Sequence, residues 1–500
     1  MRLPPEKDMT EADLVAALAR SADLLEAVVE DRSLLAALDL ETRRRLLVAA
    51  GRIARPDAVS RRRLARAFRR REENRRHRAD TALLERTEIR TLRRAPVYQT
   101  PPALPLADPP PDDAAEELHE ARKCYVCKAP FSRVHFFYDQ MCPRCAALNW
   151  EKRQQTADLR GRVALVTGAR VKIGYQAAIM LLRAGARVIA TTRFPRDAAQ
   201  RYAREADFAA WADRIDVYGV DLRHTPSVET FCREVVERYD RLDFLLNNAC
   251  QTVRRPVGFY DHLLRTETEP LAGRPDAERK LLAAHERVGG TTGVVARPAL
   301  VDSARASQVA LLDEDLRNGH DIFPAGRLDA DLQQVDLRER NSWRLALDEV
   351  SSVELLEVHL VNAVAPFVLN ARLRSLMARE RTFDKHIVNV SAMEGQFYRA
   401  YKTDKHPHTN MAKAALNMMT RTSAADYVKD GIHMNSVDTG WITDEDAAPL
   451  AARKHAEHGF VPPLDVVDGA ARILDPIFSG IRTGEHVWGL FLKDYRPTPW

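Results

Sequence analysis

The chain has 500 residues, of which 45% are hydrophobic, enough for a sizeable core divided among two or three domains. Its 76 Lys and Arg nearly balance its 71 Asp and Glu, so the chain as a whole carries little net charge. No stretch approaches 18 uninterrupted apolar residues, which argues against a membrane-spanning helix, and the polar first residues lack a signal core. We therefore expect a cytoplasmic protein without a membrane partner.

Residues 1–95 are predicted to be helical and basic. From Thr10 to Gly51, Leu and Ala alternate with charged residues at helical spacing, and Thr10 followed by Asp13 predicts a capped first helix. From Gly51 to Ala95 we count 16 basic and 6 acidic residues. Phe68 is the one aromatic residue in the core of this run, so base stacking would be poor. A solvated surface or a subunit contact is the favoured interpretation, and a nucleic acid or an acidic protein is the less favoured alternative.

A proline-rich segment and a cysteine-rich segment follow. Residues 96–117, with seven prolines between Pro96 and Pro111, are predicted to be an extended linker. Within residues 118–152, two Cys-x-x-Cys pairs separated by 14 residues present four thiolates to one metal: Cys124, Cys127, Cys142 and Cys145. The pattern predicts a structural zinc site with no open coordination position. An iron–sulfur centre, a redox pair or two disulfides are the alternatives, and the lack of any sign of secretion argues against disulfides.

The segment from Arg162 to Gly174 predicts a phosphate-binding turn. Val163 to Val166 is a short apolar run typical of a buried parallel strand, Gly168 begins a turn, and helical spacing starts at Ile173. Such a turn points free backbone N–H groups and the positive end of a helix dipole at one place, which suits a pyrophosphate. The spacing alone is weak evidence, because Lys172 stands where the usual pattern has its middle glycine.

Further strands alternate with helices through the rest of the chain. Their expected positions are 187–191, 217–222, 242–250, 386–391 and 434–440. This alternation predicts a doubly wound parallel α/β sheet of Rossmann type over residues 158–500. Ligands of such sheets lie beyond the carboxyl ends of the strands.

These motifs resemble the short-chain dehydrogenase/reductase family over about Leu159 to Leu492. Six matches occur in order: Thr167-Gly168 with Ile173-Gly174, Asp221-Leu222, Asn247-Asn248-Ala249, Asn362, Ser391, and Lys413-Ala414-Ala415-Leu416. The resemblance implies that Asn362 anchors a water relay, that Ser391 hydrogen-bonds the substrate oxygen, and that Lys413 holds the nicotinamide ribose and lowers the pKa of a catalytic tyrosine. It also implies cofactor contacts from Thr167, Gly168, Arg170, Lys172, Ile173, Gly174, Arg193, Asp221, Leu222, Asn248, Ala249, Lys413, Gly440 and Thr443.

The chain departs from the family at the tyrosine itself. Four residues before Lys413, where the family has tyrosine, stands Thr409. A threonine hydroxyl has a pKa far above the phenolic value of about 10, so it is no useful acid at neutral pH. Three hypotheses stay open: Tyr401 or Tyr398 returns from a lengthened loop, His408 or a water donates the proton, or the domain binds a dinucleotide without chemistry.

Charge near the phosphate turn favours NADP(H) over NAD(H). Enzymes of this shape that select NAD(H) carry an acid at the end of the second strand, which accepts from the ribose 2′-hydroxyl. Here that position reads Thr191-Thr192-Arg193, with no carboxylate before Asp197. Together with Arg170 and Lys172, Arg193 gives three cations that suit a 2′-phosphate.

An insertion of about 100 residues, 251–350, separates the fourth strand from the helix that carries Asn362. Helices are predicted around 276–288 and 303–316. Because it follows a strand, the insertion emerges at the carboxyl edge of the sheet, where we expect a cap over the substrate or a subunit contact. A disordered insertion is the alternative.

Two classes of function follow from these features. The first is an NADP(H)-preferring oxidoreductase that acts on an alcohol or carbonyl of a small molecule, as a homo-oligomer. The second is a catalytically inactive dinucleotide-binding sensor or scaffold, whose zinc and basic N-terminal regions bind a partner.

Overall fold

The computed structural model describes residues 10–103, 116–289, 300–316, 322–398 and 402–500. The chain divides into two compact units, Met1–Ala79 and Asp80–Trp500. The division falls at Ala79 and not at residue 95, because residues 80–95 bond to the cysteine-rich segment. Asp80 accepts hydrogen bonds from the backbone N–H groups of His119 and Glu120, and Arg90 pairs with Asp139 at 2.7 Å.

The first unit is helical, as the sequence predicted. It comprises α1 (Glu11–Glu30), a 3-10 turn (Arg32–Ala37), α2 (Leu40–Ala54) and most of α3 (Ala58–Glu85). Thr10 and Asp13 form the expected capping box at the start of α1. None of the described side chains of residues 10–79 is buried, and apolar ones such as Leu24 and Val29 are exposed. This unit therefore has no core of its own within one chain.

The second unit is built around an eight-stranded sheet with the order β10-β9-β8-β7-β6-β3-β4-β5. Seven strands are parallel, and β10 pairs antiparallel with β9 at one edge. The strands are β3 (Val163–Thr167), β4 (Arg187–Thr192), β5 (Ile215–Gly219), β6 (Phe244–Asn247), β7 (Lys385–Ser391), β8 (Ile432–Asp438), β9 (Phe491–Lys493) and β10 (Arg496–Thr498). The predicted Rossmann-type α/β sheet is confirmed.

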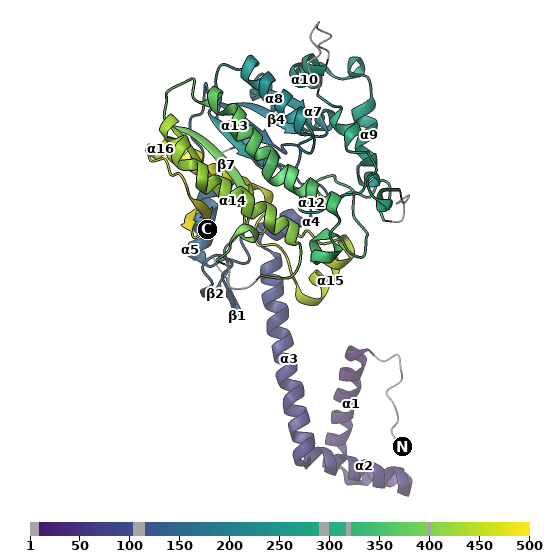
Figure 1. Ribbon diagram of the computed structural model, residues 1–500. Helices are drawn as coiled ribbons and strands as arrows, with labels where there is room; N and C mark the ends of the chain where they lie inside the picture. Colours follow the sequence, from purple (N-terminus) through teal and green to yellow (C-terminus); the bar gives the residue numbers. More distant parts are fainter. Residues whose placement is uncertain (1–9, 104–115, 290–299, 317–321, 399–401) are drawn as a thin grey trace. The chain divides into compact units, whose positions relative to one another are not determined.

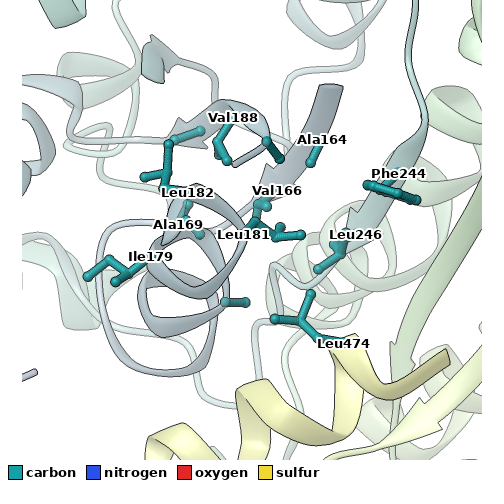
Figure 2. Close-up of a cluster of buried hydrophobic side chains, with 14 of the residues drawn as sticks. Ala164, Val166, Ala169, Ile179, Leu181, Leu182, Val188, Phe244, Leu246 and Leu474 are labelled. Carbon is teal, nitrogen blue, oxygen red and sulfur yellow. The ribbon is translucent and has the colours of Figure 1, made fainter. Parts of the chain in front are cut away.

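Helices cover both faces of this sheet (Figure 1). The chief ones on the first face are α6 (Lys172–Arg183) and α16 (Val466–Thr483), and those on the second are α8 (Thr225–Arg238), α13 (Ala365–Met377) and α14 (Pro407–Tyr427). Figure 2 shows the first face, where Leu181 of α6 and Leu474 of α16 pack against Val166 of β3. All three side chains are fully buried. Each such burial contributes about 1.5–3 kcal/mol, so the first face is a strong hydrophobic contact.

Among the described residues, one helical stretch, Ser352–Met377, is long and apolar enough to cross a membrane by length and composition. It comprises α12 (Ser352–His359), a π-helical turn (Leu360–Val364) and α13. Half of its apolar window is buried inside the fold, and α13 contributes Leu369, Leu373 and Leu376 to the second face of the sheet. Such burial is typical of a core helix.

The insertion is ordered over its described residues and contains α9 (Asp261–Thr268), α10 (Asp276–Gly289) and α11 (Ser303–Ala306). α10 matches the helix predicted at 276–288. The helix predicted at 303–316 is wrong in extent, because only α11 and a 3-10 turn at Asp313–Leu316 form. The carboxylate of Asp315 accepts from the backbone N–H groups of Leu311 and Leu312 and from Arg254, which gives this segment a non-helical alternative.

The cysteine-rich segment forms a small module on the second unit. It consists of α4 (Glu88–Arg94), the hairpin β1 (Glu117–Lys123) and β2 (Pro130–Arg133), and α5 (Pro143–Arg153). Residues 104–115 of the predicted linker lie outside the described residues. Residues 96–103, which are described, are hydrogen-bonded to the sheet domain and are not an extended linker. The Tyr98 N–H donates to Ala330 O, and the Thr100 hydroxyl donates to Glu205.

A buried ionic cluster joins this module to the start of α16. The guanidinium of Arg153 at the end of α5 donates to both carboxylate oxygens of Asp465, at 2.6 and 2.7 Å, and to Asp468 at 3.1 Å. Tyr138 donates its hydroxyl to Asp468. Burial and the neighbouring Asp465 raise the pKa of Asp468; burial also acts to raise that of Asp465, but Arg153 holds it below its usual value. The cluster is fully satisfied only while Arg153 is present.

Replacing Arg153 with Met is expected to destabilise the second unit by about 3–5 kcal/mol, because two buried carboxylates lose their shared cation. Urea unfolding monitored by tryptophan fluorescence would measure this change. Arg160→Met is the matched control, since Arg160 pairs with Asp158 in full solvent exposure. Equal stability of the two variants would contradict the role of the cluster.

Candidate functional site

The glycine turn after β3 is closely packed against the end of β6. Gly168 has a φ of +66°, and a Cβ there would lie 2.9 Å from Ala249 Cα. A Cβ at Gly174 would lie 2.3 Å from Asn248 Nδ2 and 2.4 Å from Gly168 O. Both positions therefore require glycine, the first for its backbone conformation and both for space.

The same turn is held by hydrogen bonds from the two residues that follow β6. Asn248 Nδ2 donates to Thr167 O at 2.9 Å, and the Ala249 N–H donates to Thr167 Oγ1 at 3.0 Å. α6 begins directly after the turn at Lys172, and its first turn contains no acidic residue. The free N–H groups and positive dipole end of such a helix attract phosphate. The residues present thus fit the pyrophosphate of a dinucleotide.

The three cations of the predicted 2′-phosphate site have different surroundings. Arg170 is buried and pairs at 2.8 Å with Asp197, which Arg201 also contacts at 2.7 Å. Burial acts to raise the pKa of Asp197, but these two arginines hold it below its usual value. Asp197 reaches Arg170 because α7 (Pro195–Ala203) begins three residues after β4. This pairing was not predicted from the sequence.

Arg193 and Lys172 meet residues that follow far along the chain. The Arg193 guanidinium donates to the Tyr260 hydroxyl at 2.6 Å and lies 4.7 Å from the centroid of that ring. Burial raises the pKa of Asp331, although the nearby ammonium of Lys172 acts to lower it. Lys172 also acts with Arg255 to keep the pKa of Glu445 low in spite of burial. No local pattern in the sequence could predict these partners, since contacts from the insertion and from the loop after β8 depend on tertiary folding.

The insertion covers the end of β4 with an apolar cluster. Its members are Phe194, Phe259, Tyr260, Leu263, Ala304 and Phe323, and all but Phe194 come from the insertion. Ser303 Oγ donates to Arg193 O at 2.8 Å. The insertion therefore lies at the carboxyl edge of the sheet, as its place after the fourth strand implied.

The remaining cofactor-site residues lie at the ends of other strands. Asp221 follows β5, is buried, and accepts from Arg223, which also donates to Glu357 at 3.0 Å. Leu222 beside it is buried in the second-face core. Beyond β8, Gly440 has a φ of +79°, and Thr443 Oγ1 donates to Glu445 at 2.7 Å.

Three of the residues assigned to catalysis lie around the end of β7 and along α14. Lys413 is 4% exposed, and its Nζ donates to Val390 O at 2.7 Å. Ser391 Oγ donates to Asn417 Oδ1 at 2.6 Å. Thr409 is buried one helical turn before Lys413, and its hydroxyl finds no hydrogen-bond partner among the described residues.

Asn362 lies in the π-helical turn between α12 and α13. Its side chain forms two hydrogen bonds with the backbone of Gln251, one from the Gln251 N–H at 2.8 Å and one to Gln251 O at 2.9 Å. Gln251 is the first residue of the insertion. π-Helical turns occur often at functional positions, and this one fixes Asn362 against the chain that leaves β6.

The candidate proton donors separate into distinct environments. Tyr398 is 78% exposed, so its hydroxyl is turned to solvent, and Tyr401 lies outside the described residues. His408 is buried in the first turn of α14, with Nε2 3.6 Å from Glu354 Oε1. α14 begins at Pro407 and carries both Thr409 and Lys413.

The four module cysteines converge as the spacing predicted. Their sulfur atoms all lie within 4.8 Å of one another, and the Sγ atoms of Cys127 and Cys142 are 3.7 Å apart. None of the four is in a disulfide. Tyr125, between the first two cysteines, accepts a hydrogen bond from the Trp441 N–H in the loop after β8. The module thus contacts the loop that carries Gly440 and Thr443.

Comparison with known proteins agrees with this geometry. Residues 162–264 match the family described as short chain dehydrogenase, and residues 331–461 match the family described as Enoyl-(Acyl carrier protein) reductase. The uncharacterized protein R665 of Acanthamoeba polyphaga mimivirus is 31% identical over 370 residues, 71% of each chain. Human retinol dehydrogenase 14 is 34% identical over 117 residues, which are 20% of this chain and 35% of that protein.

Solved structures of similar proteins were also found. The NADPH-bound carbonyl reductase from chicken fatty liver is 17% identical, with a TM-score of 0.41, over 68% of this chain and all of that one. A short chain dehydrogenase from Burkholderia cenocepacia in complex with NADP is 18% identical, with a TM-score of 0.42, over 67% of this chain and 97% of that one.

Proposed function

This chain belongs to the short-chain dehydrogenase/reductase family, and on that basis we propose that it is an NADP(H)-preferring oxidoreductase acting on an alcohol or carbonyl group. The observation that carries the proposal is the buried ammonium of Lys413 beside the end of β7. Burying an ammonium is costly, and the described residues give Lys413 Nζ one hydrogen bond, to Val390 O. Its two other N–H groups are free to donate to ribose hydroxyls and to a proton donor.

The bound cofactor would supply or accept the hydride, and the residues of the chain would do the rest. The turn from Gly168 to Gly174 would hold the pyrophosphate, and Lys413 would orient the nicotinamide ribose. Ser391 Oγ donates its hydrogen bond to Asn417 Oδ1, so its lone pairs would accept a hydrogen bond from the hydroxyl of the alcohol form of the substrate. Asn362 would keep the backbone of Gln251 in place at the edge of the pocket.

Tyr401 is our first choice for the proton donor. A nearby ammonium lowers the pKa of a phenol toward neutral pH. The pKa of an aliphatic hydroxyl such as that of Thr409 stays far above neutral pH even beside an ammonium. His408, paired with Glu354, is the second choice. The non-catalytic alternative, a dinucleotide-binding sensor or scaffold, draws support from Thr409 at the tyrosine position and from the solvent exposure of Tyr398.

Apolar aldehydes are the trial substrates that we propose. Trp441 and Phe397 are exposed in the loops after β8 and β7, at the carboxyl edge of the sheet. Trp441 lies 4.5 Å from Phe460, centroid to centroid, so an aromatic surface lies on one of these loops. Retinol dehydrogenases and a fatty acyl-CoA reductase are among the relatives, which makes retinal and long-chain aldehydes reasonable first choices.

We further propose a cytoplasmic homo-oligomer with zinc in the cysteine module. Apolar side chains remain exposed on α12, α13 and α14: Leu356, Phe367, Met411 and Met418. A second copy of the chain would bury them. Four convergent thiols without a disulfide match a closed tetrahedral zinc site.

The protein is expected to bind NADPH at least tenfold more tightly than NADH, about 1.4 kcal/mol, because Arg193 follows β4 where NAD(H)-selective enzymes have an acid. Fluorescence titration of both cofactors measures this ratio. Arg193→Asp should reverse the preference. Arg204→Asp is the control and should leave the preference unchanged, because Arg204 is exposed and follows the end of α7. Equal affinity of the wild-type protein for NADH would end the NADP(H) proposal.

Tyr401→Phe is expected to lower turnover of an accepted aldehyde by about 100-fold or more while NADPH affinity stays the same, because only the proton donor is lost. Thr409→Val should change turnover little. Steady-state kinetics on the three proteins checks this. Loss of turnover in His408→Gln with full activity in Tyr401→Phe would transfer the role to His408, and tight NADPH binding without turnover of any aldehyde would favour the sensor.

Cys142→Ser is expected to lose one zinc equivalent relative to the wild-type protein and to keep NADPH binding within about twofold, because metal and module fold together. Elemental analysis of purified protein measures the metal. Cys232→Ala, a buried cysteine of α8, is the control and should keep its zinc. Unchanged zinc content in Cys142→Ser would refute the four-cysteine site.

A further inference from the structure

Three histidines meet at the amino ends of the central strands, away from the site described above. His386 is the second residue of β7 and His433 the second residue of β8, and the two are direct partners in the parallel register. His486 approaches from the segment between α16 and β9. One ring nitrogen from each histidine lies within 4.8 Å of those of the other two. The glycine turn lies at the opposite, carboxyl edge of the same sheet.

The three rings are packed closely and are largely buried. His386 is fully buried, His433 is 8% exposed, and His486 is partly exposed. His386 Nε2 lies 2.9 Å from His486 Nδ1, and the rings of His433 and His486 stack with centroids 4.8 Å apart. Gly480 of α16 makes room for them, since a Cβ there would lie 2.5 Å from His486 Nδ1.

The hydrogen bonds of the cluster leave it incompletely satisfied. His433 Nδ1 lies 3.1 Å from Lys385 O, to which it can only donate, so its Nε2 carries a lone pair. His386 Nδ1 is buried and finds no partner among the described residues. Buried imidazoles with unused nitrogens are costly as a packing device.

We propose that His386, His433 and His486 bind a divalent transition metal ion, with zinc the first candidate. Three neutral imidazoles are a ligand set for Zn²⁺, Cu²⁺ or Ni²⁺ and a poor one for Mg²⁺ or Ca²⁺, which prefer oxygen. The bond from His433 Nδ1 to Lys385 O is the second-sphere contact that commonly orients a ligating histidine. Partial exposure of His486 leaves a fourth position open to water.

Such an ion would link the segment before β9 to the central strands of the sheet. His386 and His433 belong to central strands, whereas His486 immediately precedes the segment that forms β9 and β10. A metal shared by the three would fix that segment to β7 and β8 at one end, while β9 pairs with β8 at the other. This site is separate from the four cysteines and does not depend on the dinucleotide proposal.

The test is a metal titration of the full chain, purified without a histidine tag and stripped with a chelator. Zinc alone is added, and bound zinc is counted after desalting. The wild-type protein should retain two equivalents, and His486→Gln and His433→Gln one each. His455→Gln, an exposed histidine of α15 (Ala448–His458), should retain two. Far-ultraviolet circular dichroism of each variant checks that the fold survives.

Cobalt substitution identifies which site has been lost. Cobalt on four thiolates gives intense sulfur charge-transfer bands, and these should persist in His486→Gln and vanish in Cys142→Ser. The weaker bands of a nitrogen-ligated ion should show the reverse. The proposal is overturned if wild-type protein and His486→Gln bind the same number of zinc ions, whatever that number is. If the cysteine site fails instead, the wild-type protein binds one ion and His486→Gln none.

Discussion

The buried ionic cluster at the start of α16 is the contact on which the rest of the second unit depends. Arg153 brings the cysteine module to Asp465 and Asp468, and Asp465 at the same time caps α16. α16 in turn packs on α6, where a Cβ at Gly469 would lie 2.9 Å from Ile173. One helix thus connects the module to the turn that would hold the pyrophosphate. Every charge in the cluster is buried. Loss of one partner would therefore leave an unpaired buried charge and strongly destabilise the fold.

This arrangement gives the cysteine module a physical connection to the site. The Tyr125 hydroxyl accepts a hydrogen bond from the Trp441 N–H. A Cβ at the neighbouring Gly440 would lie only 3.1 Å from the same hydroxyl. The loop after β8 therefore contacts the module directly. A metal on the four cysteines would order the module itself, with no ligand position open for chemistry.

The insertion changes the electrostatics of the cofactor region. Arg170 is already neutralised by Asp197, and Lys172 lies near Asp331 of the insertion. Arg193 is held against Tyr260 and lies near Asp221, whose pKa its charge helps to hold low. Each of the three cations therefore has a carboxylate in its surroundings.

The sequence alone determined the fold class and the edge of the sheet at which the candidate site lies. Apolar runs such as Val163–Val166 alternate with helical spacing, and parallel strands place their carboxyl ends at one edge, so Gly168, Asn248 and Ser391 had to lie near one another. The capping box at Thr10 and the convergence of four cysteines were local enough to be predicted from spacing.

Only the tertiary structure decided which groups meet across long separations in sequence. The pairing of Arg170 with Asp197, the hold of Gln251 on Asn362, and the cluster of His386, His433 and His486 each join segments that no local pattern connects. The helix expected at 303–316 failed for a related reason, since Asp315 is drawn to Arg254 of a distant segment. Periodicity reports what each segment buries, whereas charge pairing and metal geometry depend on the packing of whole elements in three dimensions.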